Sequence, residues 1–331
     1  MRLATLNDGS RDGRLVIVSS DLARCVPASG IAESLQQALD NWADIAPLLE
    51  TRQADLGEGA SEGVEPFDQT AALAPLPRAW QWLDASAFPS HGKLCAKALG
   101  TPAIAEGIPL MYQGLSDRFL GPGAKVPLPN EEDGIDFEGE FGVIVDDVPM
   151  GTSASDALHH IKLIVQINDW SLRELAGREM KTGFGWVHAK PASAMAPVAV
   201  TPDELGDAWR EGRVALDLSI KWNGELFGRA NGAAMGYGFH DLVAHAARTR
   251  DLPAGTIIGS GTVANENYRE VGSSCILERR GIEIIDHGEP RTPYMRFGDR
   301  VQMEARGPDG SPLFGSIDQE VVPATVPGRQ R

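Results

Sequence analysis

The chain has 331 residues, 42% of them hydrophobic and 23% charged, a length and composition that exclude a disordered or fibrous protein. Such a chain forms one large domain or a large domain with a smaller one. The 46 acidic and 30 basic residues give a formal net charge of −16, which would repel phosphate backbones and anionic lipid surfaces. We therefore expect neither nucleic acid nor a membrane as a partner.

The cysteines and the N-terminus bear on the cellular compartment. Cys25, Cys95 and Cys275 are too few and too far apart for a disulfide framework or a zinc knuckle. The N-terminus lacks the apolar core of a signal peptide, and no apolar run approaches the roughly 20 residues that cross a bilayer. These features predict a soluble protein of the cytoplasm.

The first third of the chain begins with strand and helix patterns. Residues 3–6 and 14–19 predict two short strands around a turn-rich segment, and hence a hairpin. Apolar residues then recur at helical spacing over residues 31–49, with Ser29 as the expected N-cap. The apolar stripe of this amphipathic helix is typical of core packing.

A segment rich in glycine and acidic residues, 56–69, predicts a linker, so we expect a small N-terminal domain over residues 1–70 and a larger one over residues 71–331. Strand patterns dominate the larger domain, at residues 137–145, 162–168, 214–222, 256–263, 274–285 and 300–304. Short helical patterns cover residues 154–160 and 241–250. The prediction is an α+β fold that is mostly β, with too few long helices for a doubly wound parallel sheet.

The most informative segment is the strand pattern that starts at residue 135. Alternation places Asp136, Glu138 and Glu140 on one face and apolar residues on the other. Neighbouring glutamates on one strand face repel each other unless they are solvated or share a cation. Two interpretations stay open, a half-buried strand with a wet acidic face or part of a cation site.

Other polar residues have ordinary explanations when taken singly. Asp169 follows an apolar strand and could simply cap a turn. Asp84 and His91 flank a loop of small residues, and Lys190 lies in a loop rich in glycine and aromatic residues. His188, two residues before Lys190, competes with His91 as a candidate base, and the pattern does not choose between them.

Taken in order, these segments resemble the fumarylacetoacetate hydrolase family, especially bacterial members with a short N-terminal domain. The resemblance rests on Asp84, His91 seven residues later, Glu138-Gly139-Glu140, Asn168 to Ser171, Arg173 and Lys190. It runs from about Trp82 to the end, and the opening residues also look like the bacterial members. The resemblance implies a mixed β-roll, or sandwich, carrying a small N-terminal α+β domain, and a homodimer.

The resemblance also implies a metal site, whose ligands would be Asp84, Glu138, Glu140 and Asp169. Carboxylate oxygens suit Mg²⁺ or Ca²⁺, with Mn²⁺ as a further candidate, and disfavour structural zinc. Four carboxylates and one doubly charged ion sum to about −2, so an anionic substrate would need positive charge nearby. Lys190 and Arg173 are the residues that would supply it.

The reaction implied by the resemblance is hydrolysis of a carbon–carbon bond in a β-diketo acid. His91 would act as general base on a water that attacks the distal ketone, and Lys190 would stabilise the developing negative charge. Tyr112 and Thr262 match positions that contact substrate. The leading expectation is hydrolysis of fumarylacetoacetate to fumarate and acetoacetate, the last step of tyrosine breakdown.

Two positions depart from the family pattern. A substrate-contacting Gln after the Arg becomes Ala176, and the Glu that pairs with the catalytic His falls on Ile276 in a gap-free alignment. Three acidic residues could replace that Glu, namely Glu266, Glu278 and Glu106. Alternatives therefore stay open: a fumarylpyruvate hydrolase, a 2-oxo acid hydratase or decarboxylase, or a protein that binds Ca²⁺ only for stability.

Overall fold

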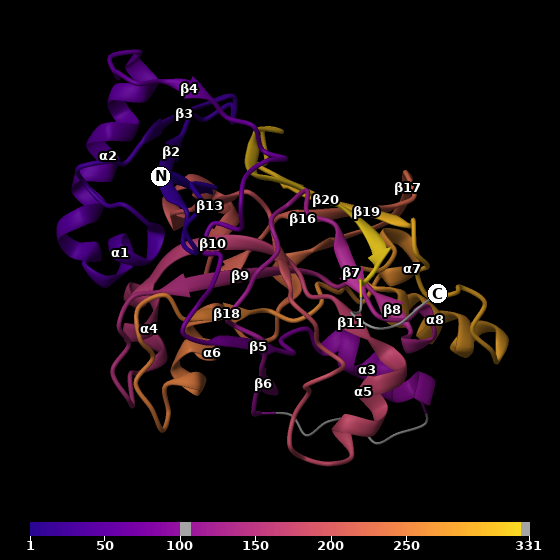
Figure 1. Cartoon of the computed structure of the whole chain (residues 1–331). Coiled ribbons are helices and arrows are strands. Elements are labelled where there is room, and N and C mark those ends of the chain that lie inside the picture. The colour runs from indigo at the N-terminus through magenta and orange to yellow at the C-terminus, as the bar shows by residue number, and fades with distance from the viewer. Residues whose placement is uncertain (100–106, 326–331) are drawn as a thin grey trace.

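The computed structural model describes residues 1–99 and 107–325 (Figure 1). Its largest sheet has, in spatial order, the strands β4 (Glu65–Pro66), β3 (Arg24–Pro27), β2 (Arg14–Val18), β1 (Arg2–Leu6), β13 (Val198–Val200), β10 (Ile161–Asn168), β9 (Gly139–Val145), β18 (Ile257–Gly259), β5 (Trp82–Ala85) and β6 (Met111–Gln113), with β12 (Ala194–Met195) paired to β10. The second sheet has the order β17 (Glu225–Asn231), β16 (Asp217–Trp222), β19 (Arg300–Arg306), β20 (Pro312–Pro323) and β7 (Val126–Leu128). The expectation of a mostly β fold is thus confirmed.

Two short strand pairs and a set of helices complete the described part of the chain. The strand pairs are β8 (Ile135–Asp136) with β11 (Ser171–Leu172), and β14 (Trp209–Arg210) with β15 (Arg213–Val214). The α-helices are α1 (Leu35–Asp40), α2 (Trp42–Glu58), α3 (Pro89–Leu99), α4 (Ala154–His160), α5 (Arg173–Met180), α6 (Phe239–Ala246), α7 (Tyr268–Val271) and α8 (Ile276–His287). Three 3₁₀ helices are η1 (Glu131–Asp133), η2 (Pro202–Ala208) and η3 (Gly232–Ala234).

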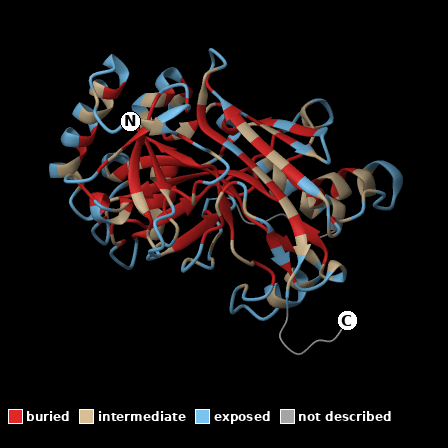
Figure 2. Ribbon diagram, turned by 45° about the horizontal axis from the view of Figure 1, so that its top comes forward, coloured by how far each residue is buried: buried red, intermediate tan, exposed pale blue. Residues whose placement is uncertain are grey.

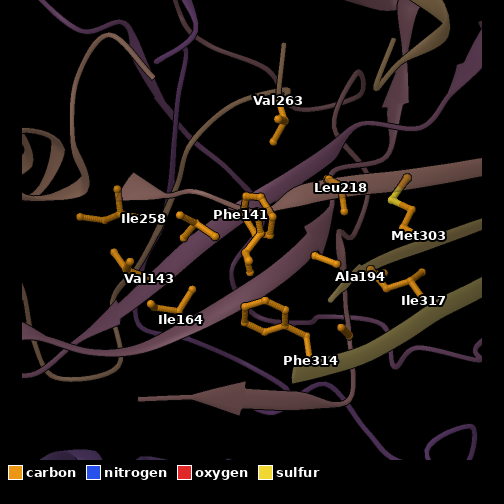
Figure 3. Packing of buried hydrophobic residues seen from close by; sticks show 14 of the residues in the cluster. Phe141, Val143, Ile164, Ala194, Leu218, Ile258, Val263, Met303, Phe314 and Ile317 are labelled. Atoms are coloured by element: carbon orange, nitrogen blue, oxygen red, sulfur yellow. The ribbon is translucent and has the colours of Figure 1, made fainter. Parts of the chain in front are cut away.

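The large sheet is buried on both faces at its centre. On one face, Phe141 of β9 packs in a cluster with Leu218 of β16 and Phe314 of β20, which joins the two sheets (Figure 3). On the other face, Ile144 belongs to a second cluster that includes Leu39 and other residues of α1 and α2. Figure 2 accordingly shows the sheets mostly buried and the outer helices and loops exposed. Burial of each such large apolar side chain contributes about 1.5–3 kcal/mol to stability.

The predicted hairpin at the N-terminus is confirmed, since β1 and β2 pair antiparallel with Leu3 opposite Ile17. Strand β1 also pairs with β13, with Leu3 opposite Ala199, so the N-terminal strands extend the large sheet. The predicted helix at residues 154–160 and the strand at residues 162–168 are confirmed as α4 and β10.

The helix predicted at residues 31–49 is wrong in its bounds. Two helices, α1 and α2, meet at Asn41, and the N-cap of α1 is Ser34, which accepts a hydrogen bond from Gln37 N, rather than Ser29. Helix α2 continues to Glu58 and ends at Gly59 in a left-handed conformation, so the predicted linker begins too early. The nine residues beyond the predicted end, 50–58, include Leu56, whose side chain is buried.

The strand predicted at residues 274–285 is also wrong, because this segment forms helix α8. Its isoleucines favour a strand by propensity, but the buried residues Glu278, Gly281 and Ile282 recur at spacings of three and four, which a helix places on one face. Gly281 lets α8 approach α3, since a Cβ there would lie 2.7 Å from a methyl group of Leu94. The strand expected at residues 256–263 is shorter, only Ile257–Gly259.

Two findings bear on the predicted compartment. All three cysteines, Cys25, Cys95 and Cys275, are free thiols. Among the helices of residues 1–99 and 107–325, none is both long and apolar enough to cross a membrane.

Candidate metal centre and active site

Three carboxylates from neighbouring strands of the large sheet converge at one place. Asp84 lies on β5, Glu140 lies on β9, and Asp169 follows directly after β10. One carboxylate oxygen from each residue lies within 4.8 Å of the other two. Gly259, on β18 between β5 and β9, permits this approach, because a Cβ at that position would lie 2.3 Å from Asp84 Oδ1. The sheet thus brings together residues that lie far apart in the sequence.

The chemistry of this cluster of three carboxylates fits a divalent cation. All three side chains are buried, and within the described residues neither carboxylate oxygen of Glu140 has a hydrogen-bond partner. Burial and the charge of Asp169 raise the pKa of Asp84, and burial and the charge of Asp84 raise the pKa of Glu140 well above its ordinary value. Such repulsion is relieved by a shared cation, and hard oxygen donors suit Mg²⁺, Mn²⁺ or Ca²⁺. The set of donors therefore fits the predicted ion.

Glu138 lies beside this group but is occupied by basic residues. Its Oε1 is 3.0 Å from Lys190 Nζ and 2.6 Å from an Arg173 guanidinium nitrogen. Burial by itself would raise the pKa of Glu138, but the charges of Arg173 and Lys190 outweigh it and hold that pKa well below its ordinary value. The structure therefore places three of the four predicted ligands in one cluster and the fourth in an adjacent buried ion-pair network.

Lys190 links the two parts of the site. Its Nζ is 2.6 Å from Asp169 Oδ2, in addition to its contact with Glu138, and the side chain is only 6% exposed. The ammonium lies 5.3 Å from the ring centre of Tyr112 and 5.5 Å from that of Trp186, within the range of cation–π attraction. The positive charge predicted to offset an anionic substrate is therefore present beside the carboxylates.

The two predicted substrate-contacting residues also face the carboxylates. The Tyr112 hydroxyl donates a hydrogen bond of 2.6 Å to Asp169 Oδ2, and the Thr262 hydroxyl donates to Glu138 Oε2. Two serines to which the sequence assigned no role complete these contacts. Ser171 Oγ donates to Glu138 Oε1 at 2.9 Å, and Ser193 Oγ donates to Asp169 Oδ1 at 2.6 Å.

His91 lies on α3 and faces a buried carboxylate of α8. Its Nδ1 is 3.7 Å from Glu278 Oε1, and its Nε2 is 3.7 Å from Cys95 Sγ, one turn further along α3. Burial lowers the pKa of His91, but Cys95 and Glu278 outweigh burial and raise it well above its ordinary value. The charge of His91 also helps to lower the pKa of Glu138, so the imidazole is electrostatically coupled to the carboxylate site.

The remaining candidates from the sequence lie elsewhere. His188 is 79% exposed and its Nδ1 is 3.3 Å from Glu179, whereas His91 is 17% exposed beside Glu278. Among the possible acidic partners of His91, Glu266 is exposed and Glu106 lies outside the described residues. The gap-free alignment fell two residues before Glu278, on Ile276, which is the first residue of α8 and fully buried, whereas Glu278 is the residue that faces His91.

Asp136 is a buried residue whose contacts the sequence did not indicate. Its Oδ2 is 2.7 Å from Arg173 Nε, and its two oxygens accept hydrogen bonds from the backbone N–H groups of Ile276 and Leu277, at 2.7 and 3.0 Å. These are the first amides of α8, the helix that carries Glu278. The only signal for Asp136 in the sequence was strand alternation, which placed it on the same face as Glu138 and Glu140.

Comparison with protein families gives two matches that together span most of the chain. Residues 81–322 match the model described as fumarylacetoacetate (FAA) hydrolase C-terminal, and residues 1–78 match fumarylacetoacetase N-terminal domain 2. The boundary between the two matches lies at residues 79–80.

Individual relatives are more distant. The chain is 27% identical over 157 residues to 2,4-didehydro-3-deoxy-L-rhamnonate hydrolase of Sphingomonas sp. (strain SKA58), which is 46% of this chain and 52% of that protein. It is 26% identical over 157 residues to the mitochondrial oxaloacetate tautomerase Fahd2a of Rattus norvegicus, which is 46% of this chain and 48% of that protein. The match therefore spans about half the length of both relatives.

Solved structures share the fold over nearly the whole chain. A probable 2-hydroxyhepta-2,4-diene-1,7-dioate isomerase from Mycobacterium abscessus is similar with a TM-score of 0.68 and 20% identity, covering 98% of this chain and 100% of that one. Maleylpyruvate hydrolase from Sphingobium sp. SYK-6, in complex with manganese (II) ion and pyruvate, is similar with a TM-score of 0.65 and 18% identity, at the same coverage. Because the family model covers residues 81–322, this chain belongs to the fumarylacetoacetate hydrolase family.

Proposed function

We propose that this protein is a divalent-metal-dependent hydrolase that cleaves a carbon–carbon bond in a β-diketo acid, and that fumarylacetoacetate is its substrate. The observation that carries the proposal is that the cluster of three carboxylates, from Asp84, Glu140 and Asp169, shares a site with His91, a histidine that faces a buried glutamate. A cation site by itself could exist only to stabilise the fold. A His–Glu pair beside it indicates catalysis, because such a pair can accept and donate protons.

In this proposal, Asp84, Glu140 and Asp169 hold the cation, and Glu138 joins them when the ion is bound. The cation would supply Lewis acidity and orient the two oxygens of the diketo acid. Relatives support this choice, since the maleylpyruvate hydrolase structure contains manganese (II) ion. The cation is proposed to be Mg²⁺, Mn²⁺ or Ca²⁺, all of which accept oxygen donors.

His91 is the proposed general base. In the neutral form it would take a proton from a water, whose oxygen then attacks the distal ketone, while the negative charge of Glu278 stabilises the imidazolium that results. The carbon–carbon bond to the attacked carbonyl carbon would then break, its electron pair would leave with the acetoacetate part as an enolate, and the proton held by His91 would return to that carbon. Lys190 and Arg173 are proposed to offset the negative charge that develops on the substrate, because both are buried beside Glu138. Tyr112, which donates to Asp169, and Thr262, which donates to Glu138, are proposed to contact the substrate.

The choice of fumarylacetoacetate rests on the family matches. Both parts of the chain match models named for fumarylacetoacetase, so we take fumarylacetoacetate as the first substrate and infer a role in tyrosine breakdown. Ala176, in place of a substrate-contacting Gln, argues for comparing both substrates directly.

A second candidate function is proton transfer within a 2-oxo acid, without cleavage. The match to oxaloacetate tautomerase over 157 residues favours it, and a His–Glu pair would serve a tautomerase equally well. A 2-oxo acid hydratase or decarboxylase is a further alternative that keeps the same cation site.

The decisive experiment is turnover of fumarylacetoacetate by protein that has been stripped with chelator and resupplied with Mg²⁺, Mn²⁺ or Ca²⁺. Loss of the diketone absorbance, with fumarate and acetoacetate formed in equal amounts and only after a cation is restored, supports the hydrolase. Fumarylpyruvate and oxaloacetate are assayed in parallel. Release of CO₂ or tautomerisation without cleavage would favour a lyase or tautomerase, and no turnover of any acid would favour a purely structural cation site.

Three further expectations belong to the proposal. A homodimer follows from the resemblance, a cytoplasmic location from the cysteine content, and the division into residues 1–70 and 71–331 from composition. Light scattering of the purified protein tests the homodimer, and expression of residues 71–331 alone tests the domain division.

A further inference from the structure

Glu179, at the end of α5, makes an unusual set of contacts near the site. Its two carboxylate oxygens accept hydrogen bonds from three consecutive backbone N–H groups, those of Val187 at 3.1 Å, His188 at 2.9 Å and Ala189 at 3.0 Å. A negative charge in the last turn of a helix is unfavourable to the helix dipole, so a specific partner is needed to explain it. The three amides are that partner.

These amides lie in the short segment that carries two side chains of the site. Trp186 precedes them and Lys190 follows them, and the Trp186 ring packs edge-on against Tyr112 with 4.7 Å between ring centres. The same segment is fixed a second time, because Ala189 O accepts a hydrogen bond of 2.8 Å from Leu172 N. The backbone just before Lys190 is therefore held at both of its polar groups.

Helix α5 joins this anchor to the other basic residue. Arg173 opens the helix and Glu179 lies in its last turn, so the two basic groups that meet at Glu138 are connected through one rigid element. Figure 1 shows α5 and the loop after it together at the lower edge of the molecule. In that loop, the Phe184 side chain is 96% exposed.

We propose that Glu179 is a positioning residue, which sets the place of Lys190 and Trp186 in the site by binding the backbone of residues 187–189. The inference rests on the proposed function only for its effect on turnover. A carboxylate is suited to the task because hydrogen bonds to a charged acceptor are about twice as strong as those between neutral groups.

The test compares Glu179→Ala and Glu179→Gln with a matched control, Glu174→Ala, which removes an exposed glutamate from the first turn of the same helix. In the cation-loaded full chain, we expect hydrogen exchange at residues 187–189 to become about tenfold faster or more in Glu179→Ala. Glu179→Gln keeps one oxygen acceptor and should lie between Glu179→Ala and wild type, and Glu174→Ala should match wild type.

Turnover provides the second readout. Because Lys190 is proposed to act on charge that develops during the reaction, Glu179→Ala should lower kcat by roughly 10- to 100-fold, with a smaller change in KM and partial rescue in Glu179→Gln. Equal exchange rates in Glu179→Ala and Glu174→Ala, or equal losses of kcat, would overturn the proposal. If wild type turns over no diketo acid, the proposed function fails, while the exchange rates still decide the role of Glu179.

Discussion

Asp136 and Arg173 form a buried ion pair, in which Asp136 Oδ2 lies 2.7 Å from Arg173 Nε and the carboxylate is fully buried. The same carboxylate accepts two amides at the start of α8, so one side chain joins a basic residue of the site to the helix that carries Glu278. Burial raises the pKa of Asp136, although the charge of Arg173 opposes this shift. In the described structure Asp136 has no hydrogen bond to Asp84, Glu140 or Asp169. It nevertheless supports the site, because it holds Arg173 and the start of α8.

Replacing Asp136 with Asn should destabilise the protein strongly. The substitution removes one partner of a buried ion pair, which typically costs about 3–5 kcal/mol, and leaves an amide that cannot accept from two backbone N–H groups and Arg173 at once. The control is Asp318→Asn, which breaks the exposed pair with Arg300 and should cost about 0–1 kcal/mol. Urea unfolding of both variants measures the difference, and equal costs would contradict the assigned role.

The repulsion between Asp84 and Glu140 predicts how the cation-free protein responds to pH. A carboxyl group whose pKa is raised by folding contributes stability below its unfolded pKa, and this stability is lost as the pH rises through the folded pKa. With chelator present, Glu140→Gln should therefore have a higher Tm than wild type above about pH 6, and the difference should shrink towards about pH 4. Tm measured across this range checks the sign.

Adding a cation should reverse the order of the same two proteins. Wild type would gain stability from binding, because the ion neutralises the carboxylates, whereas Glu140→Gln lacks one of the charged oxygen donors. A Tm shift with Mn²⁺ or Mg²⁺ that is as large in Glu140→Gln as in wild type would show that the ion binds elsewhere.

The sequence predicts much of the site because its polar residues occur in an order that resembles the fumarylacetoacetate hydrolase family, whereas local patterns alone place only some of them. Glu140 lies within an alternating strand, and Asp169 ends an apolar one, so their placement at a sheet surface could be expected. Alternation could not show that tertiary packing buries this face as well, which leaves Glu140 with 0% exposure, beside Asp84 and Asp169, rather than in water. The wet acidic face, one of the two interpretations left open, is therefore wrong.

The parts that the sequence did not predict depend on tertiary packing. Asp136 and Ile276 lie 140 residues apart, and no local pattern connects a buried aspartate to the start of a distant helix. Glu278 was one of three open choices, and its segment was predicted to be a strand, in which it would lie on the same face as Ile276 and Ile282. Only the helical conformation, packed against α3, turns Glu278 towards His91.

The contact between His91 and Glu278 predicts a pH profile. A general base acts in its neutral form, so the raised pKa of His91 places the ascending limb of kcat/KM above the ordinary value of about 6.5. Replacing Glu278 with Gln removes a charge that favours imidazolium, and the limb should move to lower pH with a lower maximum. His91→Ala should lower kcat by about 10²- to 10⁴-fold. An unchanged limb in Glu278→Gln would argue against coupling.

Removing the ammonium of Lys190 should change cation binding and turnover in opposite directions. Its ammonium lies 2.6 Å from Asp169 and 3.0 Å from Glu138, so it competes with a cation for the same carboxylates. In Lys190→Met, both carboxylates lose this partner, and we expect tighter binding of Mn²⁺ by calorimetry. At the same time kcat should fall by about 10²-fold or more, because the charge proposed to stabilise the reacting substrate is gone. Lys181→Met, in the exposed loop after α5, removes an equal charge away from the carboxylates and should alter neither quantity. Weaker Mn²⁺ binding in Lys190→Met would mean that Lys190 holds the carboxylates in place for the ion instead of competing with it.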